Sequence, residues 1–426
     1  GFITSLIDPL VAAVKGVFSL TDFQAQLSAS AFFIAYGLVS LPAAVLVARR
    51  RAAPSILIAL GMMILGCVVM LAAANIAIYT LVLLGLFILA AGITILQVAA
   101  NPLAAALGDP KYSHFRLTFS QTFNSLGTFI GPYIGAVLFL EGLEVQPGHV
   151  VTESARANAL IGIDFAYFWL AGLIVMLFVF FLLQRKRVDG AAPAIGDPRD
   201  GIVDTLRDAL SSKWAVLGGA AIFLYVGAEV AIGTQMALFL NAPGVWGQSD
   251  APGAIGALAR FMALDSTPGV SLQEAGKAVS LYWGGAMVGR MIGTALLARV
   301  HAATLLTIAT AIAAGMCAYI FAIGGAPAGF IALSIGLFNS IMFPTIFTLT
   351  LERSSASAAA TSGFLCTAIV GGAVVPPIVG LVSGAAGYSV AFIVPLVCYA
   401  LICLFAIAAR RAPVHAIGDG PVVAGH

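Results

Sequence analysis

Two carboxylates stand inside apolar stretches of this chain, where an isolated charge is costly. Asp8 lies in the apolar run at the start of the sequence, and Glu229 lies near the middle of the run over residues 214–240. Ionisable side chains within an apolar span usually face protein or a water-filled cavity, because contact with lipid is unfavourable. Such carboxylates can bind and release a cation. Asp8 and Glu229 are therefore the candidates for cation coupling.

Side-chain amides form a second group of candidates. Gln97 and Asn101 are spaced i, i+4, and Gln121 and Asn124 are spaced i, i+3, so each pair shares one face of a helix. Asn339 lies near the middle of a later apolar run. Each amide offers two donors and an acceptor, which suits a ligand rich in hydroxyl groups. The alternative role for such amides is to bridge neighbouring helices.

Aromatic side chains near these groups add a further feature. Tyr225 precedes Glu229 by one helical turn, and Trp283 lies in a separate apolar run. Their rings can stack against a sugar ring. Together with the amides they favour a neutral polyol over a hydrophobic cation as the ligand.

The composition requires a lipid environment for these groups. Of the 426 residues, 61% are hydrophobic and only 9% are charged, whereas soluble domains carry roughly 25% charged residues. The 20 basic and 18 acidic residues nearly balance, so no strong field for nucleic acid is expected. The five cysteines lie in apolar runs without a metal-ligand spacing. We expect a multi-pass membrane protein in a lipid bilayer, without a metal or cofactor.

A membrane-spanning helix needs about 20 mostly apolar residues. That template predicts an all-α protein with twelve transmembrane helices, over residues 1–18, 26–48, 54–74, 78–107, 115–140, 164–183, 214–240, 271–298, 302–323, 328–351, 361–383 and 390–409. Most basic residues, including the cluster at 49–51, fall on one side of this arrangement, which predicts that both termini are cytoplasmic. Pro9, Pro102 and Pro344 are expected to kink their helices.

The longest polar stretch on the basic side divides the helices six and six. It predicts an N-terminal six-helix bundle over residues 1–184, a cytoplasmic linker over 185–213, and a C-terminal six-helix bundle with a short tail over 214–426. Weak similarity between the segments 101–138 and 343–382 supports two pseudo-symmetric repeats. Transporters built from such repeats bind substrate near the membrane midplane, between the repeats.

The motifs "LQVAANP" and "RLTFSQTFNSLGT" resemble those of the fucose–galactose–glucose:proton symporter family of the major facilitator superfamily. The likeness continues through "FLYVGAEVAIG", "YWGGAMVGRMIG" and "GLFNSIMFPTIF", so it covers nearly the whole chain. It is greatest to the bacterial glucose/galactose branch. The resemblance implies the major facilitator fold and a place in the bacterial inner membrane.

The resemblance also implies roles for individual residues. Asp8 stands at the first-helix carboxylate of the family, and Gln121 and Asn124 stand at the amides associated with its sugar site. Gln97 occupies a position where the fucose permease has a glutamate regarded as a protonation site. Glu229 occupies a position where that permease has a glutamine. The hypothesis that follows is that the ionisable group has moved to another helix, or that coupling depends on Asp8 alone.

The leading interpretation is a monomer that imports hexoses by cation-coupled symport and alternating access. The coupling ion is expected to be a proton, with sodium as the alternative. Uncoupled facilitated diffusion of sugar, a drug:proton antiporter and a sugar sensor without transport remain alternatives. "GTFIGPYIG", which loosely resembles an antiporter motif, is the basis for the second of these. The sequence contains no constellation typical of an enzyme.

Overall fold

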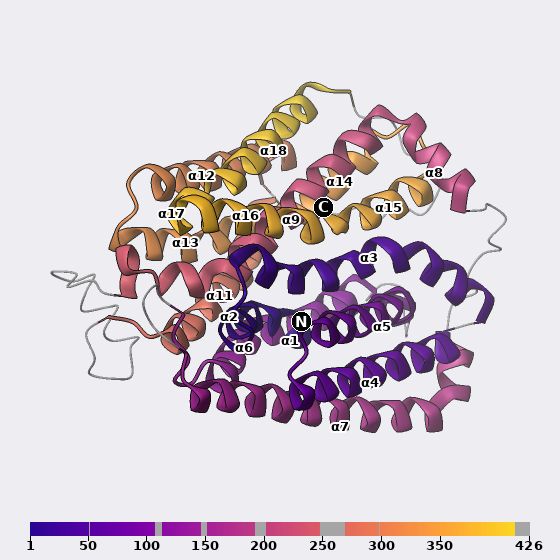
Figure 1. The fold of residues 1–426 in the computed structure, drawn as a ribbon. Helices are drawn as coiled ribbons and strands as arrows, with labels where there is room; N and C mark the ends of the chain where they lie inside the picture. Colours follow the sequence, from indigo (N-terminus) through magenta and orange to yellow (C-terminus); the bar gives the residue numbers. More distant parts are fainter. Residues whose placement is uncertain are drawn as a thin grey trace.

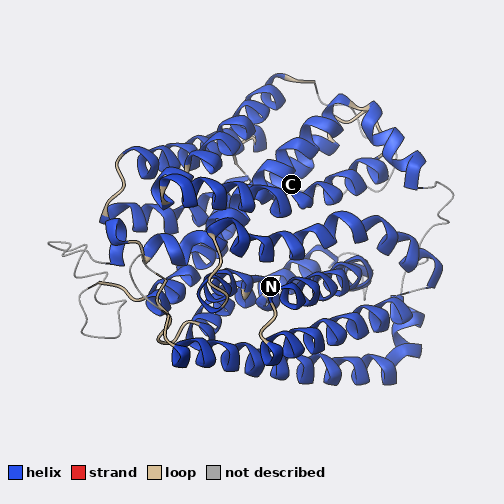
Figure 2. Ribbon diagram, viewed as in Figure 1, coloured by secondary structure: helices blue, strands red, loops and turns tan. Residues whose placement is uncertain are grey.

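The protein folds into two groups of helices that follow each other along the chain. A computed structural model describes residues 1–50, 52–106, 113–145, 151–191, 202–247, 269–297 and 299–413, which contain helices and no strand (Figures 1 and 2). In Figure 1 the helices of residues 1–191, called the first half below, lie in the lower part of the view, and those of residues 202–413, the second half, lie above them. The fold therefore has an interface between its two halves.

The first half consists of seven helical segments. They are α1 (Phe2–Ser5), α2 (Ile7–Val17), α3 (Asp22–Arg50), α4 (Ala52–Ile76), α5 (Tyr79–Ala106), α6 (Ser113–Phe139) and α7 (Glu153–Ala191). The second half consists of α8 (Ile202–Ser211), α9 (Lys213–Leu240), a π-helical turn η2 (Pro243–Gly247), α11 (Leu272–Leu297), α12 (Ala302–Ala322), α13 (Ala326–Asn339), α14 (Met342–Leu351), α15 (Ala358–Thr367), a 3-10 turn η3 (Ala368–Val370), α16 (Gly371–Ala386), α17 (Tyr388–Ala391) and α18 (Ile393–Arg411).

Nine spans in the described part of the chain are long and apolar enough to cross a membrane. They are Asp22–Val47, Ala52–Ile76, Tyr79–Ala100, Glu153–Gly190, Lys213–Leu240, Ala302–Ala322, Ala326–Leu351, Ala360–Ala386 and Tyr388–Arg411. The other three predicted segments are also helical, as α1 with α2, α6 and α11. They lack the length or the apolar character of the nine, so the count of twelve spans stays a prediction.

Three helix breaks share one cause. A break at Leu6 separates α1 from α2, one at Ile341 precedes α14, and one at Phe392 precedes α18. The third residue after each of them is a proline: Pro9, Pro344 and Pro395. Proline has no N–H to donate to the carbonyl one turn earlier, and its ring clashes with that carbonyl. By contrast, α5 continues as a helix past Pro102.

The glycines of the "GTFIGPYIG" motif explain how the first helix docks. A side chain built at Gly127, Gly131 or Gly135 of α6 would collide with Phe2, with Ser5 and with Pro9 respectively, all at under 3.0 Å. These glycines are four residues apart, so they line one face of α6. Their absent side chains let α1 and the start of α2 approach the backbone of α6. The motif therefore has a packing role in this fold.

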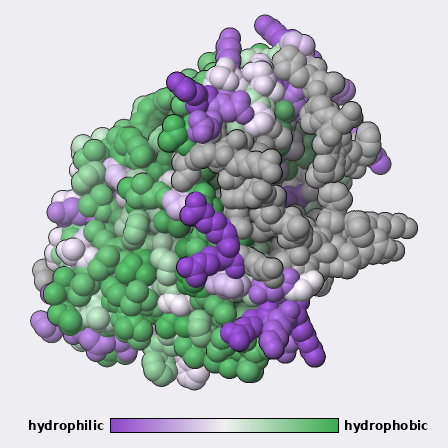
Figure 3. Space-filling view, turned by 90° about the vertical axis from the view of Figure 1, so that its right-hand side faces the viewer, coloured by the Kyte–Doolittle hydropathy of each residue, from purple (hydrophilic) through white to green (hydrophobic). Residues whose placement is uncertain are grey.

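Polar and apolar side chains are separated along the molecule. On α7, large apolar side chains such as Ile161, Trp169 and Leu183 are 62–76% exposed, which in water would be an unfavourable surface. Figure 3 views the end of the bundle at which α8 lies, and hydrophilic residues gather there while hydrophobic ones cover the flank. The outward apolar flank matches a protein whose sides contact lipid.

Candidate functional site

The Asp8 carboxylate lies at the contact between the two halves. It is only 4% exposed. Its Oδ2 accepts a hydrogen bond from Nε1 of Trp283, on α11 of the second half, at 2.6 Å. A methyl group built at Gly233 on α9 would lie 3.2 Å from Asp8 Oδ1 and 3.4 Å from the Trp283 ring. Asp8 on α2 is therefore enclosed by α9 and α11, and Gly233 makes the room for it.

Glu229 lies on the same helix as Gly233 and is held by two tyrosines. The Tyr225 hydroxyl donates to Glu229 Oε1 at 2.7 Å and lies 3.0 Å from the carbonyl oxygen of Asn339. The Tyr282 hydroxyl donates to the backbone carbonyl of Glu229 at 3.2 Å. The one-turn spacing of Tyr225 and Glu229 lets this contact form along α9. The side chain and the backbone of Glu229 are thus both engaged.

Asn339 is fully buried at the last residue of α13. Its Nδ2 donates to the Tyr282 hydroxyl at 2.7 Å, and its Oδ1 accepts from the Tyr399 hydroxyl at 2.8 Å. The amide that the sequence predicts as a sugar ligand is therefore directed at neighbouring helices. Together Tyr225, Glu229, Tyr282, Asn339 and Tyr399 form a buried network that joins α9, α11, α13 and α18.

The two carboxylates belong to one region. Trp283, which contacts Asp8, follows Tyr282, which contacts the Glu229 backbone, and the two rings are 5.2 Å apart. Asp8 and Glu229 interact electrostatically with each other, and Glu229 also interacts with Arg290. The structure therefore brings Asp8, Trp283, Tyr225 and Glu229 together.

The other four predicted amides belong to α5 and α6. Gln97 is exposed on α5, with its Nε2 directed at the Tyr36 hydroxyl at a long 3.4 Å, and Asn124 is exposed on α6. Gln97 therefore contacts α3 through Tyr36, whereas Asn124 lies on the exposed surface of α6. Asn101 and Gln121 belong to the helical backbone of α5 and α6, but their side chains lie outside the described part of the structure.

A polar contact between the halves, the first clasp, consists of Lys15, Asp22, Ser383 and Tyr388. Lys15 Nζ lies 2.5 Å from Asp22 Oδ1 and donates to the Tyr388 hydroxyl at 2.7 Å. The Tyr388 and Ser383 hydroxyls each donate to Asp22 at 3.1 Å. Sequence reasoning did not identify this contact, because Asp22 and Tyr388 are 366 residues apart.

A second clasp lies at the end of α6 and the start of α11. Glu144 Oε1 accepts from the Leu272 N–H at 2.9 Å, and its Oε2 accepts from Asn241 Nδ2 at 3.2 Å. Deeper in the interface, Thr234 donates to Gln26 Oε1 at 2.8 Å. Negative charge beside the first N–H groups of a helix is favourable. The two clasps join the halves at the end where α2 meets α3, and residues of both line a cavity of about 540 Å³ there.

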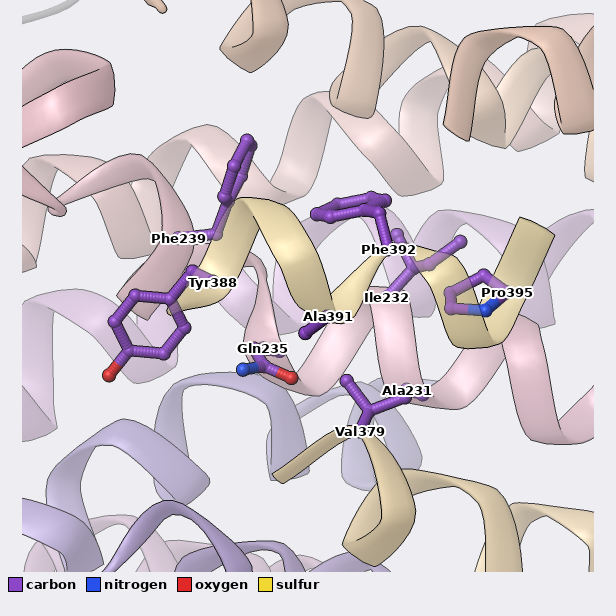
Figure 4. Close-up of a pocket in the computed structure, with 9 residues that line it drawn as sticks. All are labelled: Ala231, Ile232, Gln235, Phe239, Val379, Tyr388, Ala391, Phe392 and Pro395. Atoms are coloured by element: carbon purple, nitrogen blue, oxygen red, sulfur yellow. The ribbon is translucent and has the colours of Figure 1, made fainter. Parts of the chain in front are cut away.

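Gln235 was also not identified from the sequence. It faces a small cavity of about 10 Å³ lined by α9, α16, α17 and α18 (Figure 4), and neither its Nε2 nor its Oε1 has a hydrogen-bond partner in the described structure. That space is close to the minimum for one water molecule. The side chain lies among apolar residues of the second half, apart from the Asp8 and Glu229 site.

Comparison with known proteins identifies the family. Residues 1–368 match the model of the Major Facilitator Superfamily. The chain is 38% identical over 406 residues to the glucose/galactose transporter of Brucella abortus, covering 95% of this chain and 90% of that one. It is 33% identical over 418 residues to the L-fucose-proton symporter of Escherichia coli, covering 94% and 88%.

A solved structure supports the same assignment. The crystal structure of the E. coli fucose:proton symporter FucP matches with a TM-score of 0.62 at 27% identity, covering 96% of this chain and 97% of that one. These relatives are transporters and not enzymes. The chain is thus a multi-pass inner-membrane transporter that belongs to the Major Facilitator Superfamily, in the family of the fucose–galactose–glucose:proton symporters.

Proposed function

We propose that this transporter imports hexoses of the glucose/galactose type together with a proton. The names of its relatives support sugar as the substrate class. The observation that carries the coupling is the Asp8 carboxylate, buried at the contact between the halves and bonded to Trp283 of the opposite half. A carboxyl group in that position changes the contact between the halves when it gains a proton, since a protonated carboxyl is a weaker acceptor.

The sugar site in this proposal is lined by amides and an aromatic ring. Gln97, Asn101, Gln121 and Asn124 offer donors and acceptors to sugar hydroxyls, and the half-buried Trp283 offers a ring face. Tyr225 and Asn339 contribute to the wall, because their polar atoms are bonded to Glu229 and to neighbouring helices. Glu229 is the second group that exchanges the coupling proton.

The proposed topology has twelve spans in two six-helix bundles, residues 1–184 and 214–426, joined by the linker 185–213. Both termini are cytoplasmic, since basic residues gather at the ends of α3, α7 and α18. The clasp of Lys15, Asp22, Ser383 and Tyr388 then closes the external side. Transport proceeds by rocking of the bundles, so that the clasps open when the cytoplasmic side closes. The protein acts as a monomer and needs no cofactor beyond its coupling ion.

Direct binding tests the substrate class. Purified protein is titrated with glucose, galactose, mannose and fucose across pH, with and without sodium. The proposal expects saturable binding of at least one hexose that depends on pH and not on sodium. Hexose binding that depends on sodium would indicate sodium as the coupling ion. Hexose binding that depends on neither pH nor sodium would indicate an uncoupled facilitator. Displacement of the sugar by apolar cations, without sugar transport, would indicate a drug antiporter and overturn the proposal.

A further inference from the structure

The hydroxyl of Tyr225 lies between two acceptors. It is 2.7 Å from Oε1 of Glu229 and 3.0 Å from the carbonyl oxygen of Asn339. A tyrosine hydroxyl carries a single proton. Tyr225 can therefore donate to only one of these acceptors at a time.

The protonation state of Glu229 decides which acceptor is used. An ionised carboxylate only accepts hydrogen bonds, so Tyr225 donates to it. A protonated carboxyl has an O–H that can donate to the Tyr225 oxygen, which frees the tyrosine proton for the carbonyl of Asn339. The two states therefore differ in the acceptor that the Tyr225 hydroxyl uses, and the ionised state leaves the carbonyl of Asn339 without this bond.

The second acceptor lies at a helix break. Asn339 ends α13, and α14 begins at Met342 after a break that Pro344 maintains. The last carbonyls of a helix have no partner within it, so the carbonyl of Asn339 depends on a bond from outside α13. The side chain of Asn339 is fixed by Tyr282 and Tyr399, so the bond from Tyr225 is the part of this contact that can switch.

We propose that Tyr225 is a positioning residue that transmits the protonation state of Glu229 to the break between α13 and α14. The inference rests on the proposed function, in which Glu229 exchanges the coupling proton. When Glu229 is protonated, α13 is bonded to α9 at this point. When Glu229 is ionised, the hydrogen bond from Tyr225 to the Asn339 carbonyl is lost. The angle between α13 and α14 can then change. Proton binding is thereby linked to the shape of the helix that carries Asn339.

Other charged and titratable groups also surround Glu229. Asp8 approaches it from α2, and Tyr282 and Arg290 approach it from α11. Tyr399 of α18 belongs to the same network. The residues of α13, α14 and α16 include no ionisable side chain. Tyr225 differs from this set in contacting both the Glu229 carboxyl and the backbone of the break.

Two tyrosine variants separate this role from a structural one. Tyr225→Phe removes the donor to the Glu229 carboxylate, whereas Tyr282→Phe removes a donor to the Glu229 backbone carbonyl, which does not titrate. The measurement is the pH dependence of hexose uptake into proteoliposomes. Loss of a donor disfavours the ionised form. We expect Tyr225→Phe to move the alkaline fall of uptake upward by about one pH unit, and Tyr282→Phe to leave its midpoint in place.

A third variant separates this inference from the proposed function. If uptake by Glu229→Gln keeps the wild-type pH profile, the coupling role of Glu229 is wrong. If Glu229→Gln removes the alkaline fall but Tyr225→Phe leaves it unmoved, the role of Tyr225 alone is wrong.

Infrared difference spectra of the unmodified protein across the same pH range do not depend on the folding of Tyr225→Phe. They should contain a tyrosine hydroxyl band that disappears in Glu229→Gln. Absence of that band from the wild-type spectrum would overturn the inference.

Discussion

The indole N–H of Trp283 donates to the carboxylate of Asp8 across the interface between the two halves, at 2.6 Å. The two residues are 275 positions apart in the chain, and the bond joins α2 of the first half to α11 of the second. A hydrogen bond to a charged acceptor contributes about 1.5–3 kcal/mol. Any event that neutralises Asp8 therefore weakens a contact that has to break in the proposed rocking of the two halves.

Gly233 is expected to be required for the Asp8 site. In Gly233→Ala the new methyl group lies 3.2 Å from Asp8 Oδ1, and overpacking of this kind costs about 1–3 kcal/mol. We expect kcat/KM for hexose uptake to fall about tenfold. The control is Gly315→Ala on α12, where a methyl group meets nothing within 4 Å. Equal activity of the two variants would contradict the tight fit around Asp8.

Gln97→Glu tests whether an ionisable group has moved between helices. Gln97 is exposed on α5, and in the proposed sugar site a carboxylate at this position meets water and can exchange a proton. We expect Glu229→Gln to lose proton coupling and the double variant Gln97→Glu, Glu229→Gln to recover part of it. The measurement is hexose-driven alkalinisation outside proteoliposomes. A double variant that binds hexose but does not move protons would contradict the hypothesis that Glu229 takes the role of an ionisable group at position 97.

Asp22 is expected to hold the external side closed. Asp22→Asn removes the charge that pairs with Lys15 and accepts from Tyr388 and Ser383. We expect the open state to gain about tenfold in population, since each charge-assisted bond contributes about 1.5–3 kcal/mol. The readout is labelling of Ser30→Cys, beneath the clasp, by an impermeant maleimide, with the five native cysteines replaced.

Asp164 provides the matched control for the clasp. Its Oδ1 accepts from Asn75 at 2.7 Å, and both residues belong to the first half. Asp164→Asn should therefore leave the labelling rate of Ser30→Cys unchanged. If both variants raise labelling equally, the effect is a general loss of stability and not the opening of the clasp.

Asp208 lies on α8, outside the candidate membrane spans, and its pKa leads to a prediction about how stability depends on pH. Ser357 donates its hydroxyl at 2.7 Å and its N–H at 3.1 Å to Asp208 Oδ2, and these bonds hold the pKa of Asp208 below its ordinary value. A lowered pKa stabilises the fold above the unfolded value of about 4, and this contribution is lost as the pH falls through the folded value. The melting temperature of Asp208→Ala should therefore lie below that of the wild type by a constant amount between pH 5.5 and 8.

The neighbouring Asp204 on α8 is the control for that measurement, since it is exposed. Asp204→Ala should leave the melting temperature unchanged. A gap between Asp208→Ala and the wild type that closes already between pH 8 and 5.5 would contradict the lowered pKa of Asp208.

Hydropathy predicted where the long apolar helices lie, because span length and apolar composition act locally. It did not predict α8 (Ile202–Ser211), which lies within the predicted linker. It did not predict every break. Pro9 and Pro344 were expected to kink their helices, and the structure has breaks before both. The break before Pro395 was not expected. At Pro102 there is no break, because α5 continues as a helix to Ala106, and the kink predicted there stays a prediction.

The site was predictable only in part. Tyr225 and Glu229 are one turn apart, so their contact follows from local spacing. The bond between Asp8 and Trp283 and the clasp of Lys15 with Tyr388 depend on how distant helices pack, which spacing does not encode. Asn339 is predicted as a sugar ligand, but its side chain is bonded to Tyr282 and Tyr399, which come from other helices.

The coupled movement of hexose and proton tests the account most directly. Wild-type protein in proteoliposomes should take up hexose when an inward proton gradient is imposed, and an outward hexose gradient should drive protons out with it. The double variant Asp8→Asn, Glu229→Gln should retain hexose exchange across the membrane but lose accumulation driven by the proton gradient. Unchanged accumulation in that variant would contradict the claim that these two carboxylates couple proton to sugar.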